Sequence, residues 1–393
     1  MPRIRRLTAY AARIRFRGEV RHASHSRRST RSILVACELD TGEVGWGEGL
    51  PRDYVTGETI DTAWQHLTET DFRGQVGEEF ADLPDALAVT ERLSFARPAG
   101  KRDCFGNSVR CAVELAMLDA AGKATGTSLR DLPTLKPEWS AIAERTDRVR
   151  YSAVVTCMKP RPEKLWSRAM WWWGFRDAKV KVGCKNQDEN QTLRNVRKAV
   201  GRKFDLRVDA NESWNPAEFA THLEPCRTWG ISSIEQPIPH AAADQLPALQ
   251  RQSDIPLMLD ESLCSLPDAQ WAIDGQAAKL FNIRLSKCGG IGPSLDIAAA
   301  ADAAGLGYQL GCQVGETGIL SAAGRHFATS VKNVRHREGS FGFWLVADRV
   351  TRPWVTFGHR GLARSLTGPG LGVTIDRGVV ESVSERTHAI DFG

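Results

Sequence analysis

Three acidic residues and one lysine recur at nearly constant intervals in the second half of the sequence. Glu235 follows Asp209 by 26 residues, Asp260 follows Glu235 by 25, and Lys287 follows Asp260 by 27. Each stands where a short β-branched run passes into a loop. The carboxyl ends of all strands in a parallel barrel open onto one face. Equal spacing by one strand–helix unit therefore predicts that these four side chains surround a single mouth.

The three carboxylates predict a metal site. They would repel one another at one mouth unless a cation neutralised them. Their ligand atoms are all hard oxygens, and no histidine or cysteine stands at the equivalent places. This donor set favours Mg²⁺ over zinc or copper. We therefore expect Asp209, Glu235 and Asp260 to hold magnesium.

Two further lysines, Lys179 and Lys181, lie one strand before the first carboxylate. Residues i and i+2 of a strand point the same way, so both ammonium groups are expected to face the barrel interior. Like charges near a divalent cation lower each other's pKa, which lets one lysine act as a base near neutral pH. Lys287 is expected to approach from the opposite side. A substrate carboxylate on the metal would then have a lysine on each face of its α-carbon, and the metal would stabilise the enediolate formed when the α-proton leaves.

The elements that must position these residues follow a barrel pattern. From about Tyr151 onward, β-branched runs alternate with helical stretches, which is typical of βα units and a parallel sheet. Eight such units close a barrel. The predicted strands lie near Tyr151–Thr156, Ala178–Val182, Leu206–Ala210, Ser232–Glu235, Leu257–Asp260, Leu280–Arg284, Gly307–Gly311 and Asn333–Glu338.

The amino-terminal part predicts a separate α+β unit. Strands are expected at Arg13–Phe16, Ile33–Leu39 and Val44–Gly49, and a helix at Ser108–Lys123. The tail is again strand-like and is expected to return to this unit. The predicted fold class is α/β: a TIM-type (β/α) barrel over residues 136–360, with an α+β capping domain formed by residues 1–135 and the tail, 361–393.

Composition narrows the functional class. Hydrophobic residues make up 42% of the chain and the net charge is +5; no apolar run reaches the ~20 residues of a membrane span, and no basic stripe suggests nucleic-acid binding. The alternation in Arg13–Arg17 favours a strand over a targeting helix. Nine cysteines without a CxxC pair predict reduced, mostly buried thiols in a cytoplasmic protein. Trp171, Trp172 and Trp173 are expected to pack against the barrel or a domain interface.

Five segments together resemble the enolase superfamily, specifically its muconate-lactonizing-enzyme branch, the mandelate racemase/muconate lactonizing enzyme family. The capping-domain motif Gly45-Trp46-Gly47-Glu48 extends the resemblance to nearly the whole chain. The resemblance implies that Asp209, Glu235 and Asp260 bind Mg²⁺, that Lys181 and Lys287 are the acid/base pair, and that Lys179 tunes Lys181. The five segments are Lys179-Val180-Lys181-Val182-Gly183, Arg207-Val208-Asp209-Ala210-Asn211, Ile234-Glu235-Gln236-Pro237, Asp260-Glu261-Ser262 and Lys287-Cys288-Gly289-Gly290.

The same resemblance suggests where a substrate is recognised. In such enzymes a loop here numbered 22–28 folds over the mouth, so His25 and Arg28 are candidate contacts. Dipeptide epimerases carry Asp-x-Asp at the end of the eighth strand, where this chain has Glu338-Gly339-Ser340; only one charge remains, which disfavours a dipeptide substrate. Glu316, after the seventh strand, is expected either to orient Lys287 or the substrate, or to serve structure alone.

The expected activity is a Mg²⁺-dependent isomerase of a small carboxylate, first a racemase or epimerase of an amino-acid derivative. A muconate-type cycloisomerase and an o-succinylbenzoate synthase-like dehydratase are rivals that share the intermediate. A non-catalytic barrel that binds a ligand and a Schiff-base aldolase using Lys181 or Lys287 are alternatives of other classes. Homo-oligomerisation is left open.

Overall fold

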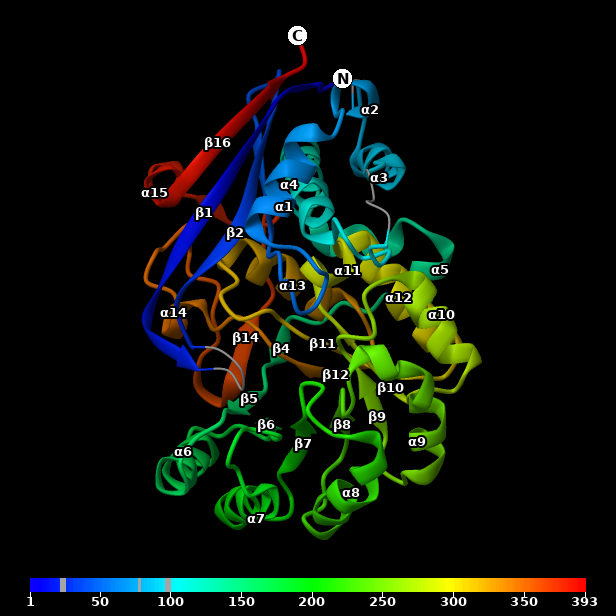
Figure 1. The fold of residues 1–393 in the computed structure, drawn as a ribbon. Helices are drawn as coiled ribbons and strands as arrows, with labels where there is room; N and C mark the ends of the chain where they lie inside the picture. Colours follow the sequence, from blue (N-terminus) through cyan, green and yellow to red (C-terminus); the bar gives the residue numbers. More distant parts are fainter. Residues whose placement is uncertain (22–25, 77–78, 96–99) are drawn as a thin grey trace.

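The protein consists of a four-stranded antiparallel sheet and an eight-stranded parallel sheet, each covered by helices (Figure 1). The structure is a computed structural model that describes residues 1–21, 26–76, 79–95 and 100–393. No helix in these ranges is long and apolar enough to cross a membrane.

The antiparallel sheet has the strand order β16-β1-β2-β3. Residues 40–43 form the tight turn from β2 to β3, where the Leu39 N–H donates to the Glu43 carbonyl at 2.9 Å. The last strand, β16, lies against the first, with Asp391 opposite Arg6. Thus both ends of the chain contribute to one sheet. The strands are β1 (Ile4–Arg21), β2 (Ser26–Leu39), β3 (Val44–Gly49) and β16 (Ser384–Asp391).

Helix α4 packs directly on strand β3. A side chain at Gly47 would place its Cβ 1.9 Å from the carbonyl oxygen of Ala112 in α4, so only glycine permits this approach. The helix agrees with the predicted one and extends it by a residue or two at each end. The helices that precede the barrel are α1 (Ile60–Glu69), α2 (Arg73–Val76), α3 (Leu83–Arg92), α4 (Asn107–Thr125), the 3₁₀ helix η1 (Leu129–Thr134) and α5 (Pro137–Ser140).

All eight predicted barrel strands are confirmed, and they follow one another in the sheet in sequence order. The first and last are not joined by a ladder within the described chain, but the Ser152 N–H donates to the Arg337 carbonyl across this gap at 2.8 Å. The strands are β5 (Ala153–Val155), β6 (Asp177–Lys181), β7 (Asp205–Asp209), β8 (Ile234–Glu235), β9 (Leu257–Leu259), β10 (Leu280–Ile283), β11 (Gly307–Leu310) and β12 (Val334–Arg337).

One main helix follows each strand from β5 to β11 and covers the outside of the barrel. These helices are α6 (Pro160–Trp172), α7 (Glu189–Val200), α8 (Phe219–Thr228), α9 (Leu246–Gln252), α10 (Leu266–Asp274), α12 (Ile291–Ala303) and α13 (Gly318–Ser330). Short elements complete the chain: α11 (Leu285–Cys288), α14 (Gly342–Leu345), α15 (Arg377–Val383), η2 (Pro216–Glu218), η3 (His240–Gln245), η4 (His359–Gly361), and the pairs β4 (Arg148–Arg150) with β14 (Leu362–Arg364) and β13 (Thr351–Arg352) with β15 (Thr374–Ile375).

Two buried carboxylates fasten the amino-terminal unit to the barrel. Glu48 of β3 accepts hydrogen bonds from the Thr317 and Leu320 N–H groups at the start of α13, at 3.0 and 3.1 Å. Glu114 of α4 accepts from the Ile291 and Gly292 N–H groups at the start of α12, at 2.7 and 2.9 Å. Each carboxylate thereby satisfies the open N–H groups at a helix N-terminus.

The prediction that all cysteines are reduced is wrong for two of them. Cys157 and Cys184 form a disulfide; they are 27 positions apart in the sequence, and their Cα atoms are 6.1 Å apart. They follow β5 and β6, which are neighbours in the parallel sheet, so one βα unit of sequence brings the two loops side by side. The other seven cysteines are free, and all but Cys312 are buried.

Candidate active site

The first mouth residues lie in register on three neighbouring strands. Lys181 at the end of β6 is opposite Asp209 of β7, which is opposite Glu235 of β8. Asp260 comes directly after β9. The three carboxylate residues are completely buried. The even spacing seen in the sequence thus corresponds to one row of side chains at the carboxyl ends of the strands.

Lys179 lies one layer deeper and neutralises several carboxylates. Its Nζ is 3.2 Å from Asp209, 3.2 Å from Glu235 and 2.9 Å from Glu338. Burial alone would lower the pKa of Lys179, but these carboxylates raise it well above the usual value. Lys179 is therefore a fixed positive charge in the barrel interior.

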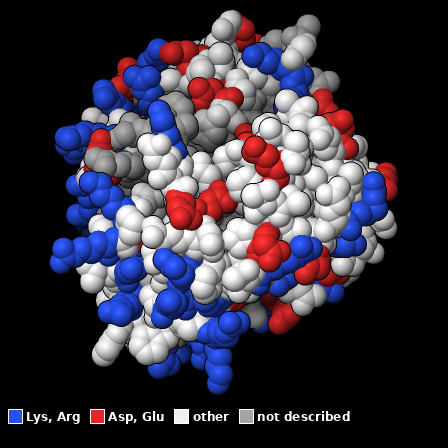
Figure 2. All heavy atoms as spheres, turned by 60° about the horizontal axis from the view of Figure 1, so that its bottom comes forward, with Lys and Arg blue, Asp and Glu red and all other residues white. Residues whose placement is uncertain are grey.

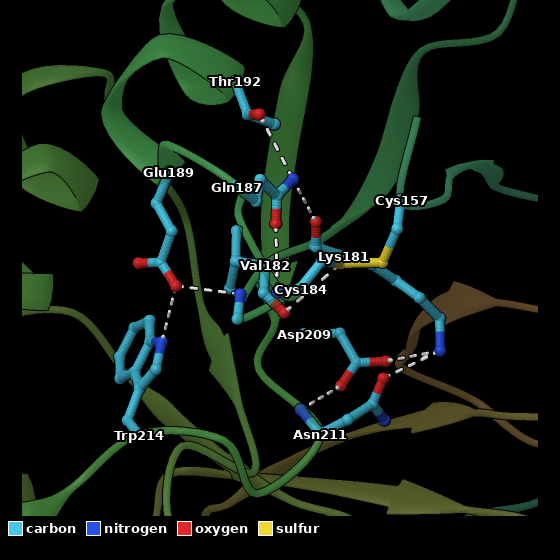
Figure 3. Close-up of a disulfide and its surroundings, with 11 residues drawn as sticks. Cys157, Lys181, Val182, Cys184, Gln187, Glu189, Thr192, Asp209, Asn211 and Trp214 are labelled. Carbon is cyan, nitrogen blue, oxygen red and sulfur yellow. Dashed lines mark hydrogen bonds and ion pairs between the residues drawn. A yellow bond between two sulfur atoms is a disulfide. The ribbon is translucent and has the colours of Figure 1, made fainter. Parts of the chain in front are cut away.

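Lys181 has a different environment, as Figure 3 shows. Its Nζ donates to Asn211 Oδ1 at 2.8 Å and lies 3.9 Å from Asp209, and its side chain keeps 12% of its surface exposed. Burial lowers its pKa, and the neighbouring charges of Lys179 and Arg284 lower it further against the effect of Asp209. Lys181 thus combines access to the mouth with a reduced hold on its proton.

The carboxylate trio fits a hard divalent cation in its chemistry. Three oxygen-donor side chains come from adjacent strand ends, and the buried Asp209 Oδ2 accepts no hydrogen bond but has the Lys179 ammonium 3.2 Å away. Their oxygens do not converge on a ready-made site: across the described residues, no three acidic, histidine or cysteine side chains do. Protein cations stand between them instead, and the closest is Arg284.

Arg284 is the mouth residue that the sequence analysis missed. It directly follows β10, just as Asp260 follows β9, and its guanidinium contacts Asp260 and lies 3.5 Å from Glu235. The strand-end rule applied to Leu280–Ile283 would have identified it. Arginine cannot be deprotonated in a protein, so this position carries a permanent positive charge.

Lys287, expected to face the substrate, does not reach the mouth in the structure. Strand β10 ends at Ile283, and the chain has already turned into α11 at Lys287. Its Nζ donates to the carbonyls of Asp260 and Asn282 at 2.6 and 2.9 Å and to Asp260 Oδ1 at 2.9 Å, and its side chain is fully buried. All three ammonium hydrogens are therefore donated within the chain.

Of the five candidate substrate contacts, Glu316, Glu338 and Ser340 line one small interior cavity. His25 lies outside the described residues. Arg28 is exposed on β2, whereas Glu316, Glu338 and Ser340 are interior residues. Each of these three has partners in its own chain: Glu316 accepts from the Gln313 N–H at 2.7 Å, Glu338 binds Lys179 and Arg207, and Ser340 Oγ accepts from Arg325 at 3.0 Å. Burial raises the pKa of Glu316 to about 8.

The disulfide lies beside Lys181 (Figure 3). Gln187 connects the two features: its side-chain nitrogen donates to the Lys181 carbonyl at 3.3 Å, and its oxygen accepts from the Cys184 N–H at 3.2 Å. A cavity of about 900 Å³ lies over these loops and is lined by both half-cystines, Lys159, Lys185 and, from β1, Glu19. The mouth is therefore flanked by a cross-linked wall on its β5–β6 side.

The comparison with known families agrees with this architecture. The family model described as "Enolase C-terminal domain-like" matches residues 164–379, which is more than half of the chain. The chain belongs to this family. Its parallel sheet with helices and its amino-terminal antiparallel sheet match the enolase-superfamily fold.

Individual relatives of this enolase-superfamily chain are isomerases. It is 27% identical to N-succinyl-L-Arg/Lys racemase from Bacillus cereus over 95% of this chain and 96% of the relative. The solved structure of N-succinyl Arg/Lys racemase from that organism matches with a TM-score of 0.85 at 25% identity, over 99% of this chain and 100% of the other. A hydrophobic dipeptide epimerase from Enterococcus faecalis is 27% identical over 89% of this chain and 93% of the relative. A chloromuconate cycloisomerase from Cupriavidus necator is 28% identical over 77% of each chain. The chain is an isomerase of the enolase superfamily.

Proposed function

We propose that the protein is a Mg²⁺-dependent isomerase that removes the α-proton of a small carboxylate, with Lys181 as the base. The observation that carries the proposal is the row Lys181, Asp209 and Glu235, in register and continued by Asp260. Asp209, Glu235 and Asp260 would hold the metal, which when bound supplies positive charge that stabilises an enediolate.

The side chains around Lys181 support this role. Asn211 accepts one ammonium hydrogen bond and so orients Nζ at the mouth. Lys179 stays charged among three carboxylates, and its charge makes proton loss from Lys181 easier. Arg284 faces the same carboxylates from β10 and would attract the substrate's carboxylate. These side chains are compatible with a substrate of the kind that the B. cereus racemase takes and equally with one of the kind that the C. necator cycloisomerase takes.

Within this reaction class, a racemase or epimerase of an amino-acid derivative needs a proton donor on each face of the α-carbon. Lys287 donates all its ammonium hydrogens within the chain, and the guanidinium of Arg284 cannot be deprotonated. Lys181 therefore remains as the base, and it acts on one face of the α-carbon. A cycloisomerase closes its lactone by adding a carboxylate oxygen to the conjugated double bond and then protonates the resulting enolate at the α-carbon, so one acid/base group on one face is enough. The presence of one available lysine, Lys181, favours a cycloisomerase as the second candidate function.

Solvent exchange tests the proposal. In D₂O with Mg²⁺, the enzyme is expected to exchange the α-proton of an N-acyl amino acid or of a muconolactone, measured by loss of the α-proton NMR signal. Lys181→Ala is expected to slow this exchange by about 100-fold or more, the contribution of a positioned general base. The matched control is Lys185→Ala, an exposed lysine on the same loop, which should exchange as the wild type does.

The stereochemistry of exchange separates the two candidate reactions. A racemase exchanges the α-protons of both enantiomers, whereas one base on one face exchanges the proton of a single enantiomer. Exchange that survives in Lys181→Ala at the wild-type rate would refute Lys181 as the base. An absence of exchange with every carboxylate tried, despite bound Mg²⁺, would refute the α-proton chemistry.

A further inference from the structure

The outer face of α6 carries a large exposed apolar area, here called the aromatic surface. It was expected to be buried by packing, but Trp172 is 78% exposed. Its members lie on α6, on the residue after it and on α14, and each is at least 40% exposed: Leu165, Trp166, Trp171, Trp172, Trp173, Phe343 and Trp344. The sequence expectation was wrong because the face of α6 that contacts the barrel is made by Glu163, Ser167 and Met170 instead.

The rings of the aromatic surface form two groups of rings in contact, which follow one another along the chain at Trp172 and Trp173. Trp171 and Trp172 are in edge contact with ring centroids 6.1 Å apart, Trp173 meets Trp344 at 6.3 Å, and Trp344 meets Phe343 at 5.0 Å. Next to these rings is an apolar cavity of about 330 Å³, lined among others by Trp166, Trp173 and Trp344. The surface therefore presents a protruding ring, Trp172, beside a recess of aromatic side chains.

The exposed area is that of an interface. A fully exposed aromatic side chain of this kind presents up to ~250 Å², so the seven residues together expose about 800 Å². Monomeric proteins rarely leave a contiguous apolar patch above about 600 Å², and about 800 Å² is what each partner contributes to a standard-size protein interface. A protrusion beside a recess is also what a two-fold contact requires, because each copy then supplies the knob for the other's hole.

The charges at the edge of the surface predict how such an association responds to salt. Helix α6 exposes Arg161, Lys164 and Arg168 and buries its one acidic residue, Glu163. In Figure 2, lysines and arginines gather at the lower left of the barrel face, while acidic side chains lie toward its centre. A two-fold contact brings like charges near each other, so salt should strengthen it by screening.

We propose that the aromatic surface is a homodimer interface in which Trp172 of each copy packs into the aromatic recess of the other. The proposal does not depend on the reaction catalysed. It assigns the exposed tryptophans to association between two copies.

Sedimentation velocity of the full chain tests this proposal. The wild type is expected to sediment with about twice the 43.3 kDa chain mass at high micromolar concentration and to dissociate more readily in low than in high NaCl. Trp172→Glu is expected to weaken the dimer about 30-fold or more, as loss of a central interface aromatic does. Because Trp172 is so exposed, the variant should keep the wild-type melting temperature when both are measured at a concentration where the wild type is monomeric.

The matched control is Trp271→Glu, which changes a tryptophan that is 40% exposed on α10, away from the surface; it should dimerise as the wild type does. A wild type that stays monomeric at high micromolar concentration overturns the proposal. So does a dimer that Trp172→Glu leaves intact. An association that salt weakens would show that attraction between opposite charges holds the copies together, and would equally overturn it.

Discussion

At the scale of single residues, the position after β10 separates this chain from a simple two-lysine mechanism. The interval in sequence between Asp260 and Lys287 is nearly the same as the intervals between the carboxylates. Spacing alone therefore predicted Lys287 as a residue of the mouth. A strand-like segment such as Leu280–Arg284 does not reveal the exact residue at which the strand ends, however. In the structure β10 ends at Ile283. Arg284 then occupies the mouth, and Lys287 becomes a buried donor in α11.

This difference predicts that Arg284→Lys adds a second base. A lysine at the end of β10 can give and take a proton where a guanidinium cannot. We expect the variant to exchange the α-proton of the enantiomer that the wild type leaves untouched, with a gain of about 100-fold for that enantiomer. Deuterium incorporation into each enantiomer, followed by NMR, measures this.

Arg284→Met is the control for that variant, since it removes the guanidinium without supplying an amine. It should gain no exchange on the second face. Equal exchange of both enantiomers by the wild type would contradict the assignment, because a second base would then already be in place.

At the scale of elements, periodicity predicted the barrel well and the loops poorly. Every barrel strand was found because alternating βα units leave a strong local pattern. The Cys157–Cys184 bond leaves no such pattern: it depends on β5 and β6 being neighbours, which only the assembled sheet establishes. The exposed face of α6 was missed for a similar reason, since three consecutive tryptophans do not reveal which of them faces the barrel.

The disulfide is expected to stabilise the loops after β5 and β6. Closing a loop of this length constrains the unfolded chain by about 3 kcal/mol, so the Cys157→Ser/Cys184→Ser double variant should have a free energy of unfolding lower by that amount, measured by denaturant unfolding. Cys312→Ser, which changes a free cysteine, is the control. Thiol titration of the unfolded, unreduced wild type should find seven thiols of the nine cysteines; nine would contradict the bond.

At the scale of the whole molecule, the contact between the amino-terminal unit and the barrel contains a titratable carboxyl group, that of Glu114. Burial raises the pKa of Glu114 from 4.5 to about 7, against the hydrogen bonds from Gly292 and Ile291. The folded state therefore holds this proton more tightly than the unfolded chain does. Its contribution to stability is complete below pH 4.5 and is lost as pH rises through about 7.

Glu114→Gln should remove this dependence. The free energy of unfolding of the wild type, taken relative to the variant, is expected to fall by about 3 kcal/mol between pH 4.5 and neutral pH. Urea unfolding at several pH values measures the difference. Glu138→Gln, at an exposed glutamate of α5, should leave the dependence unchanged. Parallel curves for wild type and Glu114→Gln would show that the interface does not titrate through this residue.

The gap between β5 and β12 determines where the barrel opens most easily. Neighbouring strands elsewhere in the barrel share ladder pairs, whereas this seam is bridged by the hydrogen bond from Ser152 to Arg337. Local opening costs least where the fewest backbone bonds must break, so β5 and β12 should part before other neighbouring strands do. The Cys157–Cys184 bond keeps the loop after β5 attached to the loop after β6 during such an opening. The row containing Lys181 then stays assembled while β5 and β12 part.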